Sequence, residues 1–167
     1  MKDTTINTVF NIYFLYPTDR DDEGNFYRLL QNFINIGTEL QAYLLDWEKM
    51  DYINENTSFP KSYLHVPADH EWFVQLAYTS GVLTKEQILS INCRIIEECD
   101  LLVYFGNGRG VLAPCGIAEL QYAKQKQVPV YTMPDLSPTA IQALRLAIKL
   151  ILKSNDNMGA NSGNSED

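Results

Sequence analysis

Residues 100–135 read DLLVYFGNGRGVLAPCGIAELQYAKQKQVPVYTMPD, and this stretch decides the fold. Residues 101–105 form a short apolar run, which is typical of a strand buried on both faces. A glycine-rich loop follows, then an amphipathic segment over 116–127, then a second strand over 128–133 that Pro134 ends. This order of strand, loop, helix and strand predicts a βαβ unit, and therefore a parallel sheet.

The segments on the amino-terminal side predict more elements of the same kind. Residues 8–16 are dense in β-branched and aromatic residues, which predicts the first strand. Residues 26–45 fit a helix, although Gly37 is a candidate interruption and 40–45 also fits the start of a strand. The long irregular stretch 46–72 is expected to hold a short strand or a lid.

Two further helices flank the central unit. Thr84 and Gln87 form a capping box at the start of a helix over 84–98. A closing helix over 137–153 has Ser137 as its cap. The pattern predicts one domain over 1–153, a flavodoxin- or Rossmann-like three-layer α/β sandwich with a mostly parallel sheet. Residues 154–167 have almost no apolar content, so we expect a disordered polar tail there.

Composition narrows the class of protein. The chain has 167 residues, 46% of them apolar and 20% charged, which suffices for one α/β domain with a core. Its net charge of −8 argues against a nucleic-acid-binding protein, because such proteins carry a basic face. The chain has neither a signal-peptide pattern nor an apolar run of about 18 residues, and its three cysteines are odd in number. We therefore expect a cytoplasmic protein with no membrane partner.

The glycine loop does not match either common nucleotide motif. Gly106 and Gly108 fit the dinucleotide fingerprint G-x-G-x-x-G, but Val111 stands where its last glycine belongs, and no Gly-Lys-Ser/Thr follows. Two interpretations remain open. Small residues and the helix start at Gly116 let backbone N–H groups approach a ligand, with Arg109 adding charge for a phosphate. Alternatively, this is a plain loop that needs glycine for its turn.

Three side chains outside the loop also have two interpretations each. Glu119 in the first turns of the helix is a candidate for catalysis, or an acid that the helix dipole favours there. Asn92 is a satisfied buried amide or a group directed into a cleft. Trp72 stacks on a base or packs under its loop. His65, His70 and the carboxylates of 19–23 lack metal-site spacing, so we expect no metal and no cofactor.

Over most of 8–135 the chain resembles the nucleoside 2-deoxyribosyltransferase-like superfamily, which includes small uncharacterised phage and bacterial relatives. The resemblance is carried by Tyr13-Phe14, Thr18-Asp19-Arg20, Asp69 to Phe73, Gly116, Glu119, Tyr122-Ala123 and Pro129-Val130. It implies that Glu119 is a nucleophile that attacks the anomeric carbon, releases the base and holds the sugar until a base or water takes it. It also implies that Tyr13 positions this nucleophile.

Two departures from the family pattern bear on the reaction. Asn92 stands where the family has an aspartate for the leaving base, and the glycine loop lacks the family's acid. We expect N-glycosidic cleavage or deoxyribosyl transfer on a nucleoside or nucleotide, with Glu119, Tyr13 and Asn92 as catalytic residues. The alternative is a lapsed enzyme that only binds a nucleotide. The resemblance further implies a homo-oligomer. The candidate substrate-binding residues are Phe14, Asp19, Trp72, Gly106, Asn107, Gly108, Arg109 and Gly116.

Overall fold

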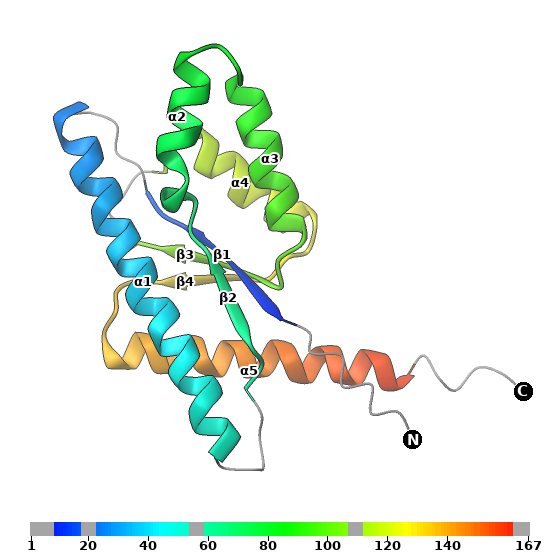
Figure 1. Ribbon diagram of the computed structural model, residues 1–167. Coiled ribbons are helices and arrows are strands. Elements are labelled where there is room, and N and C mark those ends of the chain that lie inside the picture. The colour runs from blue at the N-terminus through cyan, green and yellow to red at the C-terminus, as the bar shows by residue number, and fades with distance from the viewer. Residues whose placement is uncertain (1–8, 18–22, 54–58, 107–111, 162–167) are drawn as a thin grey trace, which may run out of the picture.

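The computed structural model describes residues 9–17, 23–53, 59–106 and 112–161, and Figure 1 shows how their elements are arranged. In chain order the elements are β1 (Phe10–Leu15), α1 (Glu23–Ile53), β2 (Ser62–His65), a 3-10 turn η1 (Pro67–Asp69), α2 (Glu71–Thr79), α3 (Lys85–Glu97), β3 (Leu101–Phe105), α4 (Pro114–Gln125), β4 (Val130–Met133) and α5 (Pro138–Asn161). The predicted α/β sandwich is confirmed.

The four described strands form one parallel sheet in the order β2-β1-β3-β4. The chain runs outward from β1 to β2 and then returns to place β3 on the other side of β1. The sheet therefore reverses its strand order between β1 and β3, at the point where open α/β sheets bind their ligands. Tyr13 lies at the centre of this arrangement, in register with His65 on one side and Leu102 on the other.

Helices cover both faces of the sheet, with α1 and α5 on one face and α3 and α4 on the other (Figure 1). Alternate side chains of a strand point to opposite faces. Ile12 and Phe14 of β1 belong to the larger core under α1 and α5, whereas Tyr13 and Leu15 belong to the smaller core under α3 and α4. The sequence of β1 thus serves two cores, which explains its nearly continuous apolar pattern.

Helix α1 continues through Gly37 without a break, so the strand considered over 40–45 is wrong. A Cβ atom at position 37 would lie 2.6 Å from the Cγ2 atom of Val66. Glycine is therefore needed at this position because the helix approaches the chain after β2 too closely for any side chain. Gly37 was a candidate for the end of the helix, and it instead marks the point where α1 packs closely against Val66.

Three other segments can be compared with their predictions. The capping box is confirmed, because the Thr84 hydroxyl accepts from the Gln87 amide while the Gln87 side chain accepts from the Thr84 amide. The irregular stretch does hold a short strand, β2, but helix α2 was not predicted. Helix α5 runs to Asn161, so the predicted disorder is wrong for 154–161, and 162–167 lie outside the described residues. Extending a packed helix needs no new nucleus, which favours this continuation.

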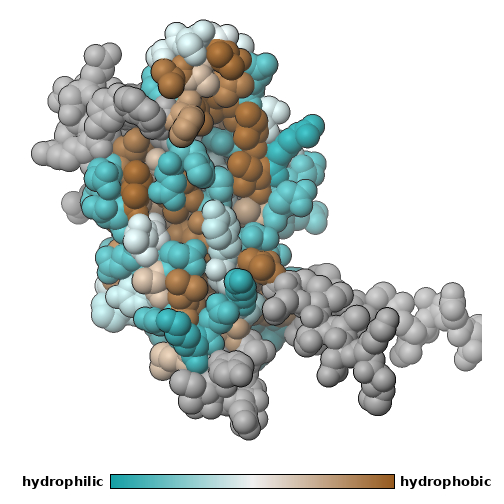
Figure 2. Space-filling view, viewed as in Figure 1, coloured by the Kyte–Doolittle hydropathy of each residue, from teal (hydrophilic) through white to brown (hydrophobic). Residues whose placement is uncertain are grey.

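An apolar surface lies at one end of the molecule, over α2 and the segment that leads into α3 (Figure 2). Its exposed members include Phe73, Leu76 and Val82, and Phe73 is 76% exposed. Residues 72–83 contain no charged side chain at all. Within the described ranges, none of the helices is both long and apolar enough to cross a membrane.

Candidate active site

Among the residues whose burial is described, Glu119 is the charged residue that the fold buries, with only 5% of its surface exposed. Two side chains from other elements donate hydrogen bonds to its carboxylate. The Tyr13 hydroxyl donates to Oε2 over 3.1 Å, and the Asn92 amide nitrogen donates to Oε1 over 2.8 Å. The three predicted catalytic residues therefore meet at one carboxylate, although 106 and 27 residues separate Glu119 from its partners.

The position of Glu119 in its helix argues against a simple dipole explanation. Helix α4 begins at Pro114, two residues earlier than predicted, so its first turn contains no acidic residue. The dipole of a helix favours acids mainly within the first turn, where they are exposed. Glu119 lies in the second turn and faces the sheet. Its burial among hydrogen-bond donors distinguishes it from an acid that the dipole favours in an exposed first turn.

Small residues and proline bring α4 close to β1. Proline suits the first helical position, because its missing N–H group would have no partner there. Gly116 is buried, and a Cβ atom in its place would lie 3.1 Å from Leu112 and 3.6 Å from Leu15. The glycine therefore allows the first turn of α4 to lie against the end of β1, which brings the following turn within reach of Tyr13.

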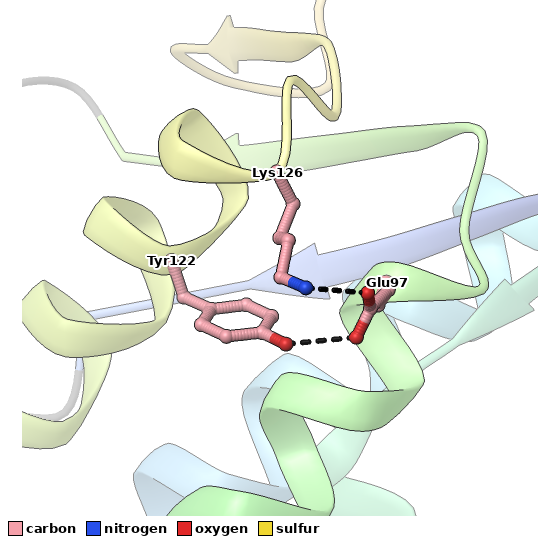
Figure 3. A network of polar contacts seen from close by, with 3 residues as sticks. All are labelled: Glu97, Tyr122 and Lys126. Carbon is pink, nitrogen blue, oxygen red and sulfur yellow. Dashed lines mark hydrogen bonds and ion pairs between the residues drawn. The ribbon is translucent and has the colours of Figure 1, made fainter.

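A polar cluster at the other end of α4 fixes its position beside α3. Tyr122 and Lys126 both donate to the carboxylate of Glu97, over 2.8 and 2.6 Å, as Figure 3 shows. Glu97 lies at the end of α3, so the cluster joins the two helices that carry Asn92 and Glu119. Because these groups are exposed, we assign the cluster an orienting role and little stabilising effect.

Burial keeps the neighbours of Glu119 in their neutral forms. Desolvation raises the pKa of Tyr13 well above 10.0, and the charge of Glu119 raises it further. The pKa of Cys93 is also raised, first by burial and then by Glu119. The phenol therefore stays a hydrogen-bond donor at any physiological pH. Two of the described neighbours, Tyr13 and Asn92, therefore meet the carboxylate as neutral hydrogen-bond donors.

Sequence reasoning missed a second ring beside Tyr13. The imidazole of His65 stacks on the Tyr13 ring, with 5.5 Å between ring centroids and 25° between planes, and His70 lies 6.0 Å beyond it. Burial lowers the pKa of His65, and His70 lowers it further, while Asp69 acts in the opposite direction. The sequence carried no signal for this contact, because it depends on the register of two parallel strands. The described residues contain no group of three potential ligands for a metal.

Among the candidate substrate-binding residues, the structure places Gly116, Gly106 and Phe14. Gly116 lies in the first turn of α4, where N–H groups lack acceptors within the helix. Gly106 is buried beside Tyr104, and its N–H group already donates to the carbonyl of Met133. Phe14 is a correction: it is fully buried on the opposite face of the sheet, against Tyr16 and Phe105. Substrate contact by its side chain would require that core to open, because side chains alternate along a strand.

The remaining candidates are not placed by the structure. Asp19, Asn107, Gly108 and Arg109 lie outside the described residues. Trp72 lies in helix α2, but its side chain is not described. Their assignment to substrate therefore remains a prediction.

An open groove of about 470 Å³ follows the outer side of the seam between α3 and α4. Cys93 and Tyr122 line it, and Glu119 does not.

Comparison with known proteins gives no family. The chain matches no family model, no curated protein and no solved structure. The arrangement around Glu119 is therefore the feature of this chain that indicates a function.

Proposed function

We propose that this protein cleaves the N-glycosidic bond of a nucleoside or nucleotide, with Glu119 as the nucleophile. One observation carries the proposal: Glu119 is buried, and Tyr13 and Asn92 donate to its two oxygens. Hydrogen bonds to both oxygens orient a carboxylate, and a retaining glycosidase needs one carboxylate so placed. The resemblance to the deoxyribosyltransferase-like superfamily selects the nucleoside as substrate.

The proposed reaction has two steps. In the first, one oxygen of Glu119 attacks the anomeric carbon, the bond to the base breaks, and its electron pair leaves with the base. In the second, water or another base attacks the same carbon and releases Glu119. Tyr13 supports both steps by holding the carboxylate, since its raised pKa keeps the hydroxyl protonated. Water as acceptor gives hydrolysis, and a second base gives transfer.

The test is base release from a panel of deoxynucleosides, deoxynucleotides and NAD, followed by liquid chromatography. We expect wild type to release base from at least one class, and Glu119→Gln to lose the activity by at least about 100-fold. Glu39→Gln is the matched control, because Glu39 is exposed on α1, on the other side of the sheet. Equal rates for wild type and Glu119→Gln would contradict the proposal.

A second candidate function is nucleotide binding without catalysis, and Asn92 is the observation that favours it. The Asn92 amide donates to Glu119, and it cannot protonate a leaving base as a carboxylic acid would. In this case nucleotides raise the melting temperature and no base appears. A ligand present at about 100 times its dissociation constant stabilises the folded state by roughly 2.7 kcal/mol.

A cytoplasmic location and a homo-oligomeric state remain predictions. The apolar surface over α2 and the segment that leads into α3 is exposed in the single chain, which makes it a candidate contact between two copies. Light scattering of the purified protein decides whether self-association occurs.

A further inference from the structure

His65 occupies a position from which it can serve the reaction at Glu119. It is the last residue of β2, so it lies at the carboxyl edge of the parallel sheet, where ligands of such sheets bind. It is in register with Tyr13, and the two rings stack on the sheet face that carries Glu119. Its side chain is neither fully buried nor fully exposed. His65, Tyr13 and Glu119 therefore form a row that leads from the sheet edge to the nucleophile.

The proposed cleavage needs a proton for the leaving base, and neither of the described donors to Glu119, Tyr13 and Asn92, is an acid at neutral pH. A departing base takes the electron pair of the glycosidic bond, and a purine or pyrimidine leaves readily only when it is protonated. The Asn92 amide has no acidic proton, and the raised pKa values of Tyr13 and Cys93 make both poor acids at neutral pH. Histidine is the side chain whose proton exchanges near neutral pH, and His65 is the histidine in contact with this group.

We propose that His65 is the general acid that protonates the leaving base. This inference rests on the proposed glycosidic cleavage. As the bond between the anomeric carbon and the base nitrogen breaks, its electron pair passes to the base, and the proton on the His65 imidazolium passes to the base as well. The imidazole is then neutral. In the second step water attacks the anomeric carbon, Glu119 leaves as the carboxylate, and the proton lost by water returns to His65.

The groups that face His65 set the pH dependence of this step. They are Tyr13 on β1, with Glu119 behind it, Asp69 at the end of η1, and His70, which starts α2. Burial and His70 hold the pKa of His65 below its ordinary 6.5, against the opposing effect of Asp69. Because the protonated form is the acid, base release should fall as the pH rises through this lowered pKa.

The experiment compares His65→Gln with His70→Gln, which changes an exposed histidine one ring further from Tyr13. Each variant is assayed from pH 5 to 8 on a purine deoxynucleoside and on nicotinamide deoxyriboside. Nicotinamide leaves as a neutral molecule and needs no proton. We expect His65→Gln to lose about 100-fold or more on the purine substrate, together with its pH dependence, and to keep the nicotinamide rate. His70→Gln should retain activity on both substrates.

Other outcomes overturn the inference in distinguishable ways. If His65→Gln lowers the rate of base release equally on both substrates, His65 positions Tyr13 and is not the acid. If His65→Gln leaves the purine rate unchanged, His65 has no role in the reaction. If wild type releases neither base, the proposed cleavage is contradicted, and the assignment of His65 as the general acid is contradicted with it. His65→Phe keeps a ring stacked on Tyr13, and it must show the same selective loss if His65→Gln folds poorly. The pKa of His65, followed by NMR of its ring protons, must lie below that of an exposed histidine.

Discussion

At the scale of single residues, burial is what turns Glu119 from a common helix acid into a candidate nucleophile. The sequence and a family resemblance predicted Glu119, Tyr13 and Asn92, and the fold brings them within hydrogen-bond distance. The same reasoning placed Phe14 at the substrate, because resemblance does not say which face of a strand a side chain occupies. His65 was missed because its contact with Tyr13 depends on strand register.

The bond from Tyr13 to Glu119 predicts a pH-dependent effect on stability. Tyr13→Phe removes a donor from a buried carboxylate, so we expect a loss of about 1–3 kcal/mol in the free energy of unfolding at pH 7. The folded pKa of Tyr13 lies above its unfolded value of 10.0, so this residue's contribution is complete below pH 10 and is lost as the pH rises further. Urea unfolding should be measured between pH 7 and about pH 11. The difference in the free energy of unfolding between wild type and Tyr13→Phe should become smaller above pH 10.

Tyr63→Phe is the matched control, since Tyr63 is 54% exposed on the neighbouring strand β2. We expect it to follow wild type over the whole range. A gap for Tyr13→Phe that stays constant or widens above pH 10 would contradict the assignment.

Asn92→Asp tests the other donor. The new carboxyl group would lie at hydrogen-bond distance from Glu119, and two carboxylates so close cannot both be ionised without cost. The pKa of the new carboxyl group is therefore raised in the folded protein. Its contribution to the free energy of unfolding is present at acidic pH and is lost as the pH rises. We expect Asn92→Asp to match wild type near pH 4 and to lose about 1–3 kcal/mol at pH 7.

Base release by the same variant gives a second measurement. If the missing acid limits the reaction, the shared proton should speed cleavage of purine substrates below neutral pH. A destabilisation that does not depend on pH would show that the new group does not face Glu119.

At the scale of elements, the clearest signals were those with a local physical cause. The Thr84 capping box and the buried strand β3 were predicted because each depends on residues close in sequence. Helix α2 was missed because it follows a stretch rich in proline, asparagine and charge. The role of Gly37 was hidden because the contact that requires glycine comes from Val66, in another part of the chain.

Gly37→Ala should therefore destabilise the protein, although alanine is the better helix former by about 1 kcal/mol. The added Cβ atom would lie 2.6 Å from Val66, whose branched side chain has little freedom to move. We expect a net loss of about 1–3 kcal/mol in urea unfolding. Val66→Ala removes the obstructing methyl groups, so the double variant should lose less than the sum of the single variants. A strictly additive double variant would contradict this close approach.

At the scale of the whole molecule, the strand order decides which residues can cooperate. The order β2-β1-β3-β4 places β1 between β2 and β3. Glu119 of α4, the helix after β3, and His65 at the end of β2 therefore both contact Tyr13. The sequence predicted a mostly parallel α/β sandwich, because the strand–loop–helix pattern is local. It could not predict the register or the division of β1 between two cores. Both follow from packing between segments far apart in the chain.

The most direct test of the central claim is to trap the sugar on Glu119. A nucleoside with fluorine at the 2-position of its sugar slows both steps, because fluorine destabilises the oxocarbenium-like transition states. If the second step is slowed more, the covalent intermediate accumulates, and peptide mass spectrometry after acid quench locates it. We predict the mass of the sugar on the peptide that contains Glu119, and none in Glu119→Gln. Base release from the same nucleoside with no adduct at Glu119, or an adduct on another residue, would contradict the account.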